Sequence, residues 1–461
     1  MTTAYTEFLA TKREIAPSVG IEVDVERMSP WLFGFQRDLA RWALRKGRSA
    51  IFADTGLGKT RMQLEWARLV CEVTGGRVLI LAPLSVARQT ATQGREELGL
   101  PVVYARSQAD AGTITVTNYE MVQHFDVTQF VGVVLDESSI LKATEGVTRN
   151  LLIDLFARTP YRLCCTATPA PNDIAEITNH SDFLGIMPRR DVLATFFRHD
   201  ADGAAWRLKN HARAAFWRWL ASWGMSLKHP SDLGYADEGF RLPHLEILPA
   251  VVASDVTFAG RLFADQPRGV TERAAVRKQT KDVRVAETVR LVEAEGDEPW
   301  IAWCGLNDEG RDVAKALGDR AILVEGSQSP EEKATRIEAF MAAPNAVLVT
   351  KPTIAGFGMN FQHCARMAFV GIGDSYEQYY QAIRRCWRYG QSREVRAHVV
   401  VADVEQAIYQ NVLRKEHEAA AMAAELVQHV ASYELAEIGR IEAGLVYDAE
   451  QQMEVPAWLQ R

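Results

Sequence analysis

The chain has 461 residues, 48% of them hydrophobic, and a formal net charge of −7 at pH 7. At about 100 to 200 residues per domain, this length excludes a single small domain and allows two or three. The charge excludes a protein coated in positive charge, although a basic cleft can exist on an acidic molecule. The six cysteines form no CxxC pair, and no apolar run approaches the roughly 18 residues that cross a bilayer. We therefore expect a soluble, cytoplasmic protein with reduced cysteines and no membrane partner.

The first half of the chain contains short apolar stretches that alternate with amphipathic ones. Each apolar stretch is followed by turn or helix signals, an order that is typical of a parallel α/β sheet. The stretches are SAIFAD, RVLILAP, TITVTN, VGVVLDE and YRLCCTAT. We predict a first α/β domain over residues 1–182.

The same alternation restarts in the second half, with PWIAWC, RAILVEG, NAVLVT, RMAFVG and RAHVVV. These stretches predict a second α/β domain over residues 296–404. Between the two domains, residues 183–250 have tryptophans at helical spacing and predict a helical insertion, and residues 251–295 predict a charged helical linker. Residues 405–461 are rich in Ala, Glu and Leu and predict a helical tail.

The predicted insertion has basic residues interleaved with aromatic ones. Residues 188–230 contain eight Lys or Arg residues against three Asp residues. Such a composition suits a protrusion that flanks DNA, with contacts to the backbone and stacking on bases. Equal weight goes to a second interpretation, in which Trp219 and Trp223, spaced for one helix face, form a small apolar core. The two interpretations can hold for different faces.

A glycine-rich loop, DTGLGKT, lies between the stretch SAIFAD and an amphipathic helical stretch. Its glycines let backbone amides approach phosphates, and the N-terminus of the following helix favours negative charge. Lys59 is placed to reach the outer phosphates of a nucleotide, and the Thr60 hydroxyl to ligate magnesium. This order of strand, loop and helix predicts a site for ATP and Mg²⁺. Its residues are Thr55, Gly56, Leu57, Gly58, Lys59 and Thr60.

Two carboxylates end the apolar part of the stretch VGVVLDESS. An apolar strand delivers Asp136 and Glu137 to its carboxyl end, where parallel sheets bind their ligands. We expect Asp136 to hold Mg²⁺ through water, and Glu137 to orient or deprotonate the water that attacks the nucleotide. The alternative, an ordinary acidic strand end, is weakened by the phosphate-binding loop that precedes it.

Together with the loop and the two carboxylates, the segment CCTATPAPND completes a pattern that resembles the superfamily two helicases. Thr166, Ala167 and Thr168 resemble the Ser/Thr-Ala-Thr motif, which in that family couples nucleotide state to domain movement. The resemblance implies two tandem RecA-like domains with ATP in the cleft between them. Upstream, WLFGFQRDLARWAL resembles the adenine-reading segment of the family, which implies bidentate hydrogen bonds from Gln36 to adenine.

Two segments of the first domain resemble the strand-contacting motifs of the family, LAPLSVARQT and VTNYEMV. The resemblance places the hydroxyls of Ser85 and Thr117 on the phosphate backbone of a nucleic acid. Without that context, simple helix caps would account for both residues equally well.

In the second domain, VLVTKPTIAGFGMNFQHC resembles the Gly-rich motif that contacts both nucleic acid and nucleotide. Gly356 and Gly358 are in matching places. The Ser-Thr-Arg of the family is replaced by a Lys-Pro-Thr segment that begins at Lys351, and we expect Lys351 to meet a phosphate.

The segment YEQYYQAIRRCWRYGQSREV resembles the Gln-Ala-Ile-x-Arg-x-x-Arg-x-Gly-Gln signature of Swi/Snf-type ATPases. Arg385 and Arg388 are three residues apart and face one way on a helix. The resemblance makes them arginine fingers, which reach ATP on the other domain and stabilise charge on the transferred phosphoryl group. Arg384 points elsewhere and is given no role. The alternative, a solvated basic helix, leaves Gly390 and Gln391 unexplained.

One departure from the family concerns its acidic motif. The usual Asp-Glu-Ala-His is Asp-Glu-Ser-Ser here and ends at Ser139, so the histidine that links nucleotide to motor is lost. We therefore expect the coupling to run differently in this chain. Its compact length resembles the stand-alone Swi/Snf-like proteins of phages and bacteria.

These features predict an ATP-dependent DNA helicase or translocase that moves on duplex or branched DNA. An RNA helicase of the same fold is the first alternative, and a non-catalytic nucleic-acid-binding scaffold is the second. Swi/Snf-like motors commonly translocate on duplex DNA without separating its strands, which ranks translocation above unwinding. We expect a monomer in the cytoplasm of a bacterium or a phage-infected cell, with a nuclease or replication protein as its kind of partner.

Overall fold

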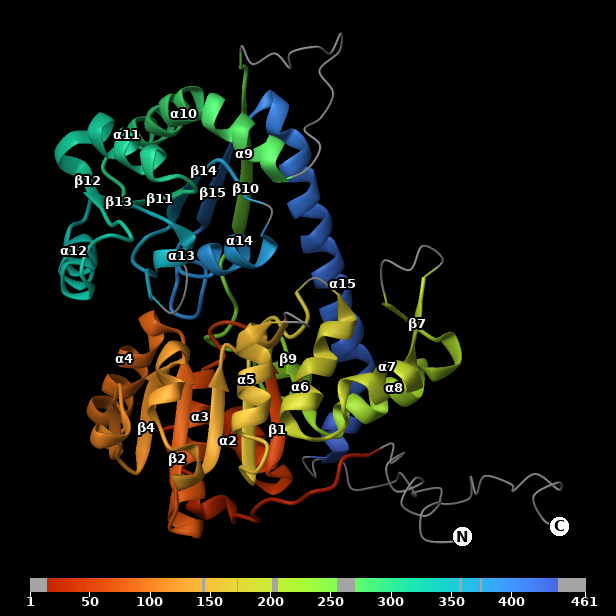
Figure 1. Cartoon of the computed structure of the whole chain (residues 1–461). Coiled ribbons are helices and arrows are strands. Elements are labelled where there is room, and N and C mark those ends of the chain that lie inside the picture. Colours follow the sequence, from red (N-terminus) through yellow and green to blue (C-terminus); the bar gives the residue numbers. More distant parts are fainter. Residues whose placement is uncertain are drawn as a thin grey trace, which may run out of the picture.

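The computed structural model has two parallel sheets in tandem, one above the other, with a long helix beside both (Figure 1). It describes residues 15–437 apart from 143–145, 172, 201–205, 255–269, 356–358 and 374. Within these residues, no helix is both long and apolar enough to cross a membrane. The predicted α/β fold class, two tandem parallel-sheet domains with helices, is confirmed.

The first sheet has seven strands, all paired in parallel, in the order β3-β4-β2-β5-β6-β1-β9. The five stretches predicted as strands are the central five, whereas the edge strands β3 and β9 were not predicted. Central strands of a parallel sheet are buried on both faces and are therefore continuous apolar runs in the sequence. The strands are β1 (Arg48–Ala53), β2 (Arg77–Ala82), β3 (Val102–Tyr104), β4 (Ile114–Asn118), β5 (Phe130–Asp136), β6 (Tyr161–Cys165) and β9 (Gly224–Leu227).

Helices cover both faces of the first sheet and make two apolar cores. Because alternate strand residues point to opposite faces, Leu79 and Leu81 join one core while Val78 and Ile80 join the other. The helices α2, α3 and α4 pack on the core of Val78, and α5 and α6 pack on that of Leu79. Their bounds are α2 (Gly34–Lys46), α3 (Lys59–Thr74), α4 (Leu84–Thr92), α5 (Val147–Leu155) and α6 (Ile177–Leu184).

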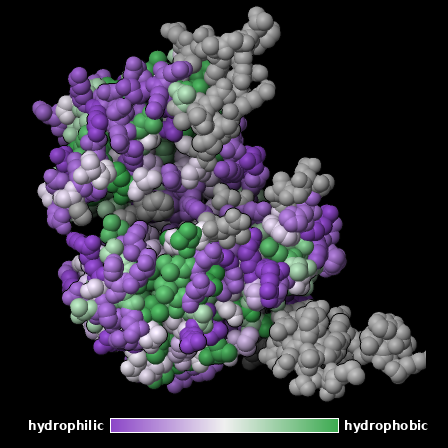
Figure 2. All heavy atoms as spheres, in the orientation of Figure 1, coloured by the Kyte–Doolittle hydropathy of each residue, from purple (hydrophilic) through white to green (hydrophobic). Residues whose placement is uncertain are grey.

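The face that carries α5 is also where apolar side chains reach the surface. Figure 2 shows them gathered in the middle of the first domain, where Figure 1 labels α5, with polar side chains around them. Val147, the first residue of α5, is 85% exposed.

The range predicted as a helical insertion contains α7 (Arg189–Phe196) and α8 (Arg213–Ala221) but also strands. β7 (Phe197–His199) and β8 (Trp206–Leu208) form an antiparallel pair, and β9 extends the first sheet beside β1. β9 has the sequence GMSL, which is too short and mixed to differ from a turn by its pattern alone. Pairing with β1 is what makes this segment a strand.

Three of the four tryptophans of this range are core residues, and Trp206 packs partly buried against the same core. Trp217, Trp219 and Trp223 are at most 1% exposed and belong to the apolar core under α5 and α6. The ring centroids of Trp219 and Trp223 lie 5.2 Å apart in an edge-to-face arrangement. These rings therefore contribute to packing, whereas contact between this range and DNA stays a prediction.

The second sheet has six strands, again all parallel, in the order β10-β15-β14-β11-β13-β12. The strands are β10 (Leu245–Val252), β11 (Trp300–Cys304), β12 (Ala321–Leu323), β13 (Val347–Thr350), β14 (Arg366–Val370) and β15 (Val395–Ala402). The helices are α9 (Val270–Gln279), α10 (Lys281–Ala294), α11 (Asn307–Leu317), α12 (Pro330–Ala342), α13 (Pro352–Ala355) and α14 (Tyr376–Ile383). The edge strand β10 precedes the residues predicted for this domain, and only its pairing with β15 assigns it to the sheet.

The predicted helical tail begins with α15 (Gln406–Glu437), a helix of 32 residues. It starts beside the second sheet and runs back along the first domain (Figure 1), where it packs on α8 and β9. Lys228, which follows β9, donates a hydrogen bond from Nζ to the Ala420 carbonyl at 3.4 Å. The helix therefore contacts both domains, and the rest of the tail, 438–461, lies outside the described residues.

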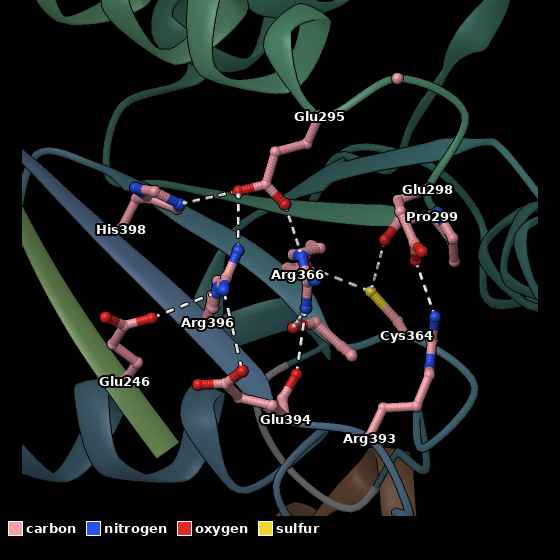
Figure 3. A network of polar contacts seen from close by, with 12 residues as sticks. Glu246, Glu295, Glu298, Pro299, Cys364, Arg366, Arg393, Glu394, Arg396 and His398 are labelled. Atoms are coloured by element: carbon pink, nitrogen blue, oxygen red, sulfur yellow. Dashed lines mark hydrogen bonds and ion pairs between the residues drawn. The ribbon is translucent and has the colours of Figure 1, made fainter. Parts of the chain in front are cut away.

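A network of charged side chains ties the linker helix α10 to the second sheet (Figure 3). Glu295, at the end of α10, accepts a hydrogen bond from Arg366 Nε at 2.5 Å and lies 3.6 Å from His398 Nε2. Arg396 on β15 contacts Glu295 at 4.0 Å and Glu246 on the edge strand β10 at 3.1 Å. One carboxylate thus connects α10 with β14 and β15.

A second set of charges on α10 is buried completely. The guanidinium of Arg284 lies 2.8 Å from Glu309 on α11 and 3.3 Å from Glu405, and each of these side chains is at most 2% exposed. A buried ion pair tolerates the loss of one partner poorly, because the remaining charge stays in the apolar interior.

We expect Arg284→Ala to lower the free energy of unfolding by about 3–5 kcal/mol, because it leaves Glu309 and Glu405 buried without their cation. Arg290→Ala is the matched control on the same helix, because Arg290 is 63% exposed and, among the described residues, pairs with Glu287 alone. This control should leave the free energy of unfolding nearly unchanged. Chemical denaturation of the three proteins measures the difference, and equal losses in both variants would contradict the buried network.

Candidate active site

The loop between β1 and α3 needs glycine at two positions. Gly56 and Gly58 have φ angles of 94° and 79°, in the left-handed region that side chains disfavour. A Cβ on Gly58 would also come within 2.2 Å of Gln36 Nε2. The loop therefore keeps its backbone open toward the space in front of α3.

Lys59, the first residue of α3, bends back over this loop. Its Nζ donates hydrogen bonds to the carbonyls of Ala53 at 2.9 Å and Asp54 at 3.3 Å. Burial lowers the pKa of Lys59, while the carboxylates of Glu137, Asp54 and Asp136 act to raise it. The amine therefore lies in the field of both carboxylates that end β5.

Asp136 ends β5 as the sequence predicts. Its Oδ1 accepts a hydrogen bond from Gln63 Nε2 at 2.7 Å, and burial raises the pKa of Asp136 to about 6. A carboxylate held in this way at pH 7 is costly unless a cation approaches it.

Glu137 follows in a strained conformation. Its φ of 58° is the single positive value for a non-glycine residue within the described residues. The carboxylate is held at Oε1, which accepts a hydrogen bond from Thr166 Oγ1 at 2.6 Å and lies 3.0 Å from Ser139 Oγ. Strain of this kind persists where surrounding contacts fix the side chain, and it is often found at active sites.

A cavity of about 440 Å³ between the two sheets collects most of the predicted site residues. Its volume lies within the range of ordinary small-molecule sites. The predicted residues that line it are Gln36, Thr55, Gly56, Gly58, Lys59, Thr60, Asp136, Glu137, Arg385 and Arg388. Leu57 lines a neighbouring, larger cavity of about 590 Å³, which shares Thr55 and Gly56 with this one.

Arg385 and Arg388 enter the cavity from the second domain. Arg385 Nη2 donates to Gln381 Oε1 at 2.8 Å, and each arginine donates from Nη1 to the Met359 carbonyl at 3.2 Å. Burial, together with the neighbouring Arg388 guanidinium, lowers the pKa of Arg385 to about 10. Neither arginine forms an ion pair with any described residue. Two buried cations that form no ion pair make a site that favours an anion, although the Glu137 carboxylate acts to raise the pKa of Arg385.

Arg384, which was given no role, contacts the phosphate-binding loop directly. It forms an ion pair with Asp54 and donates a hydrogen bond from Nη2 to the Thr55 carbonyl at 3.4 Å. Tyr380 donates its hydroxyl to Asp54 Oδ1 at 2.6 Å. Burial alone would raise the pKa of Asp54, but Arg384, Tyr380 and the Thr55 amide outweigh it and lower that pKa. The sequence contains one signal for this contact, a third arginine in the signature segment.

Gln36 lines the cavity beside Gly58 of the loop. Its Nε2 donates to the Leu57 carbonyl at 2.9 Å, and its Oε1 accepts from the Phe33 amide at 3.1 Å. The rings of Phe33, Phe240 and Tyr389 line the cavity beside it, with centroids 5.1 Å and 5.0 Å apart along the row. This part of the cavity therefore offers aromatic faces beside a fixed amide.

Thr117 and Lys351, two of the three residues predicted to contact nucleic acid, do not line this cavity. Ser85 is the second residue of α4, and Thr117, on β4, is fully buried. Lys351 follows β13 and lines a separate cavity of about 130 Å³. The loop with Gly356 and Gly358 falls outside the described residues.

The small cavity has a second cation, which the sequence did not indicate. Arg277 on α9 lines it, and its Nε and Nη2 are buried without a hydrogen-bond partner. A Cβ on Gly305 would come within 1.9 Å of Arg277 Nη2, so the guanidinium lies directly on that glycine. A polar group that is buried without a partner is costly, and this cost favours an anionic ligand.

The main cavity offers magnesium few protein ligands, as nucleotide-binding sites do. Within the described part of the chain, no group of three or more His, Cys, Asp or Glu residues could hold a metal ion. Thr60 and Asp136 both line the cavity. Asp136 accepts the hydrogen bond from Gln63 through Oδ1. Magnesium at phosphate sites usually takes one or two protein oxygens, waters and phosphate oxygens, so this pair fits the ion.

Comparison with known proteins places the second domain in a family. Residues 290–390 match the helicase conserved C-terminal domain, a range that includes Arg385 and Arg388. No curated protein sequence matches the chain. The two-domain fold is similar to that of Saccharomyces cerevisiae Dbp5 bound to RNA and ADP BeF3, at 13% identity and a TM-score of 0.53, covering 86% of this chain and 93% of that one.

A second similar structure is the Sulfolobus solfataricus SWI2/SNF2 ATPase core in complex with dsDNA. It is 16% identical, with a TM-score of 0.40, and the match covers 92% of this chain and 98% of that one. Residues 290–390 therefore match a helicase domain family, and the chain as a whole shares the tandem parallel-sheet fold of Dbp5.

Removing the charge of Asp136 should stabilise the protein in the absence of nucleotide and metal. Because its folded pKa of about 6 lies above the model-peptide value of 3.8, the group's favourable contribution is complete below pH 3.8 and is lost as pH rises through 6. We expect Asp136→Asn to raise the free energy of unfolding near pH 7, by at most about 3 kcal/mol. The gain should disappear below about pH 4.

Asp126→Asn is the control for this measurement. Asp126 is exposed, and hydrogen bonds from Thr128 and Gln129 lower its pKa, so its contribution has the opposite sign. This variant should be less stable than the wild type near pH 7. Thermal unfolding from pH 4 to pH 8 tests both variants, and a loss of stability in Asp136→Asn at pH 7 would contradict the argument.

Proposed function

We propose that this chain is a superfamily 2 helicase and, within that superfamily, a DNA translocase of the Swi/Snf type, which couples ATP hydrolysis to movement on duplex or branched DNA. The observation that carries the proposal is the single cavity in which Arg385 and Arg388 of the second domain face Lys59 and Glu137 of the first. A cation pair from one domain facing a phosphate loop on the other is the arrangement that makes hydrolysis depend on domain closure.

In this proposal each residue of the cavity has one task. Lys59 and the loop amides hold the phosphates of ATP, and Gln36 with the aromatic row holds the adenine. Thr60 and Asp136 hold Mg²⁺, which neutralises phosphate charge when bound. Glu137 orients and deprotonates the attacking water. Its Oε1 is engaged by Thr166, which leaves Oε2 for the water.

The arginines complete the site from the second domain. Arg385 and Arg388 stabilise the charge that develops on the transferred phosphoryl group. Their lowered pKa values support this role, because their charge is disfavoured by burial until an anion enters. All of these groups come from one chain, which supports a monomer as the working unit.

The choice of the Swi/Snf branch rests on the signature segment. Gln391, its last residue, is buried and donates from Nε2 to the carbonyls of Gln362 at 2.9 Å and Cys364 at 3.0 Å. The glutamine therefore fixes the segment after the arginines against the Gly-rich motif, which in the family contacts nucleic acid. An RNA helicase is the competing proposal, and the assay below separates the two.

For the DNA contact, we propose a backbone phosphate in the small cavity of Lys351. Two cations, Lys351 and Arg277, line that cavity, and the buried nitrogens of Arg277 have no partner in the described structure. Contacts of this kind position a protein on its track without reading sequence.

ATP hydrolysis by the wild type and by Glu137→Gln tests the proposed function. Each protein is assayed without nucleic acid and with single-stranded DNA, duplex DNA, forked DNA or RNA. We expect duplex or forked DNA to stimulate the wild type severalfold, and Glu137→Gln to lose about 100-fold or more of the rate.

Glu331→Gln, at an exposed position on α12, is the matched control and should keep the wild-type rate. Stimulation by RNA above that by any DNA would favour the RNA helicase. Absence of turnover under every condition would favour the non-catalytic scaffold.

Arg277→Ala and Lys351→Ala test the DNA contact. We expect each to weaken duplex binding by roughly tenfold, independently of sequence, because each removes one contact to a phosphate. The slope of log affinity against log salt should fall by about 0.9 for each lost contact. Lys278→Ala, an exposed neighbour of Arg277 on α9, is the control. An unchanged salt slope in both variants would exclude this cavity as a phosphate site.

A further inference from the structure

The hydroxyl of Ser139 lies between two carboxylates that belong to different domains. Ser139 Oγ is 3.0 Å from Glu137 Oε1 and 2.9 Å from Glu377 Oε1. Ser139 follows β5 in η6 (Ser138–Lys142), whereas Glu377 is the second residue of α14. The serine is 2% exposed and the glutamate 8%, so this contact is largely closed to water.

The Ser139 hydroxyl cannot donate a hydrogen bond to both carboxylates at once. A hydroxyl carries one proton and can donate to one of the two carboxylates only. The Lys142 ammonium pairs with Glu377 Oε2, which favours the ionised form of Glu377 and therefore its role as acceptor. The second contact, to Glu137, then becomes a hydrogen bond only when Glu137 carries a proton. The chain Glu137–H to Ser139–H to Glu377 is complete in that state alone.

ATP hydrolysis produces this state, in which Glu137 carries a proton. We propose that Ser139 and Glu377 form a proton relay that carries the proton taken up by Glu137 to the second domain. This inference rests on the proposed ATPase function and adds two residues to it. Ser139 occupies the position at which the family has the histidine of its acidic motif, so the relay replaces that histidine.

The relay begins with the attack of water on ATP. The oxygen of the attacking water bonds to the γ-phosphorus as the bond from phosphorus to the bridging oxygen of ADP breaks, and one water proton moves to Glu137. A half-turn of the Glu137 carboxyl about its Cγ–Cδ bond brings the protonated oxygen to Ser139. The Glu137 proton then moves to Ser139 Oγ while the Ser139 proton moves to Glu377 Oε1. Glu137 is a carboxylate again, and Glu377 releases the proton to solvent through its side chain, which is 9% exposed.

The relay also makes the base depend on domain closure. Ser139 and Glu377 are 238 positions apart in the chain and meet only because the two sheets are stacked. When the cleft opens, Glu377 leaves with α14, and a protonated Glu137 has no route to the second domain. Regeneration of the base is therefore tied to the closed state.

Ser139→Ala and Glu377→Gln test the relay in the full-length protein. Glutamine can still accept the Ser139 hydrogen bond but cannot take up the proton, so it separates proton transfer from positioning. In single-turnover ATP hydrolysis with saturating duplex DNA, we expect each variant to lose about tenfold in rate with the KM for ATP within about twofold. The double variant should be no slower than the single ones, because both interrupt one pathway.

Two further measurements exclude a merely structural effect. Ser138→Ala removes an equally buried hydroxyl one position away, bonded to His180 at 3.1 Å, and should keep the wild-type rate. The wild type should show a solvent deuterium isotope effect on the rate that Ser139→Ala reduces. Ser139→Thr, which keeps a hydroxyl, should retain both the rate and the isotope effect.

The outcomes separate this inference from the proposed function. An active wild type, a silent Glu137→Gln and an unimpaired Ser139→Ala would overturn the relay and leave the ATPase proposal standing. Additive losses in the double variant, or an isotope effect that Ser139→Ala retains in full, would also overturn it. A wild type without ATP turnover would overturn both.

Discussion

The carboxylate of Asp54 is the point on which the arrangement of the two domains depends. It lies in the phosphate-binding loop of the first domain, and from the second domain it accepts the Tyr380 hydroxyl and pairs with Arg384. The pair is almost fully buried at Arg384, whose side chain is 3% exposed, so water does little to weaken it. Because Asp54 and Thr55 directly precede Gly56, these contacts hold the second domain against the glycine-rich loop. The arginines that follow Arg384 reach the cavity as a consequence.

Burial disfavours several charges of the site in the protein alone. The pKa values of Lys59, Arg385 and Arg388 are lowered and that of Asp136 is raised, in each case chiefly through burial. A ligand that brings both phosphate and a divalent cation would relieve all four effects together. Sites that are costly in the unliganded protein and favourable with ligand are common in enzymes, because stability is lost where function requires charge. The electrostatic pattern therefore points to a charged, composite ligand without reference to any family.

Local patterns predict the central strands and the phosphate loop because each is fixed by its own residues. β2 and β5 are apolar on both faces, and the loop glycines have no substitute at their φ angles. Edge elements escape prediction for the opposite reason. β9 and β10 become strands only through partners that come from elsewhere in the chain. The same holds within the site, where the contacts of Arg384 and Arg277 depend on how the domains and the linker helix pack, which no spacing along the sequence reveals.

The chain passes between the two domains twice, once before β10 and once along α15, and this sets the geometry of any opening. A helix of 32 residues is about 48 Å long and resists bending. It packs on α8 and β9 of the first domain and lines the larger cavity, whereas the nucleotide-sized cavity is lined by α4. Because α15 holds the two domains together at one edge, a small rotation about α15 produces its largest displacement at α4. The path of the chain sets the distance from α15 to α4. A change of a few residues in the tail would therefore alter how far the cleft opens without changing any residue of the site.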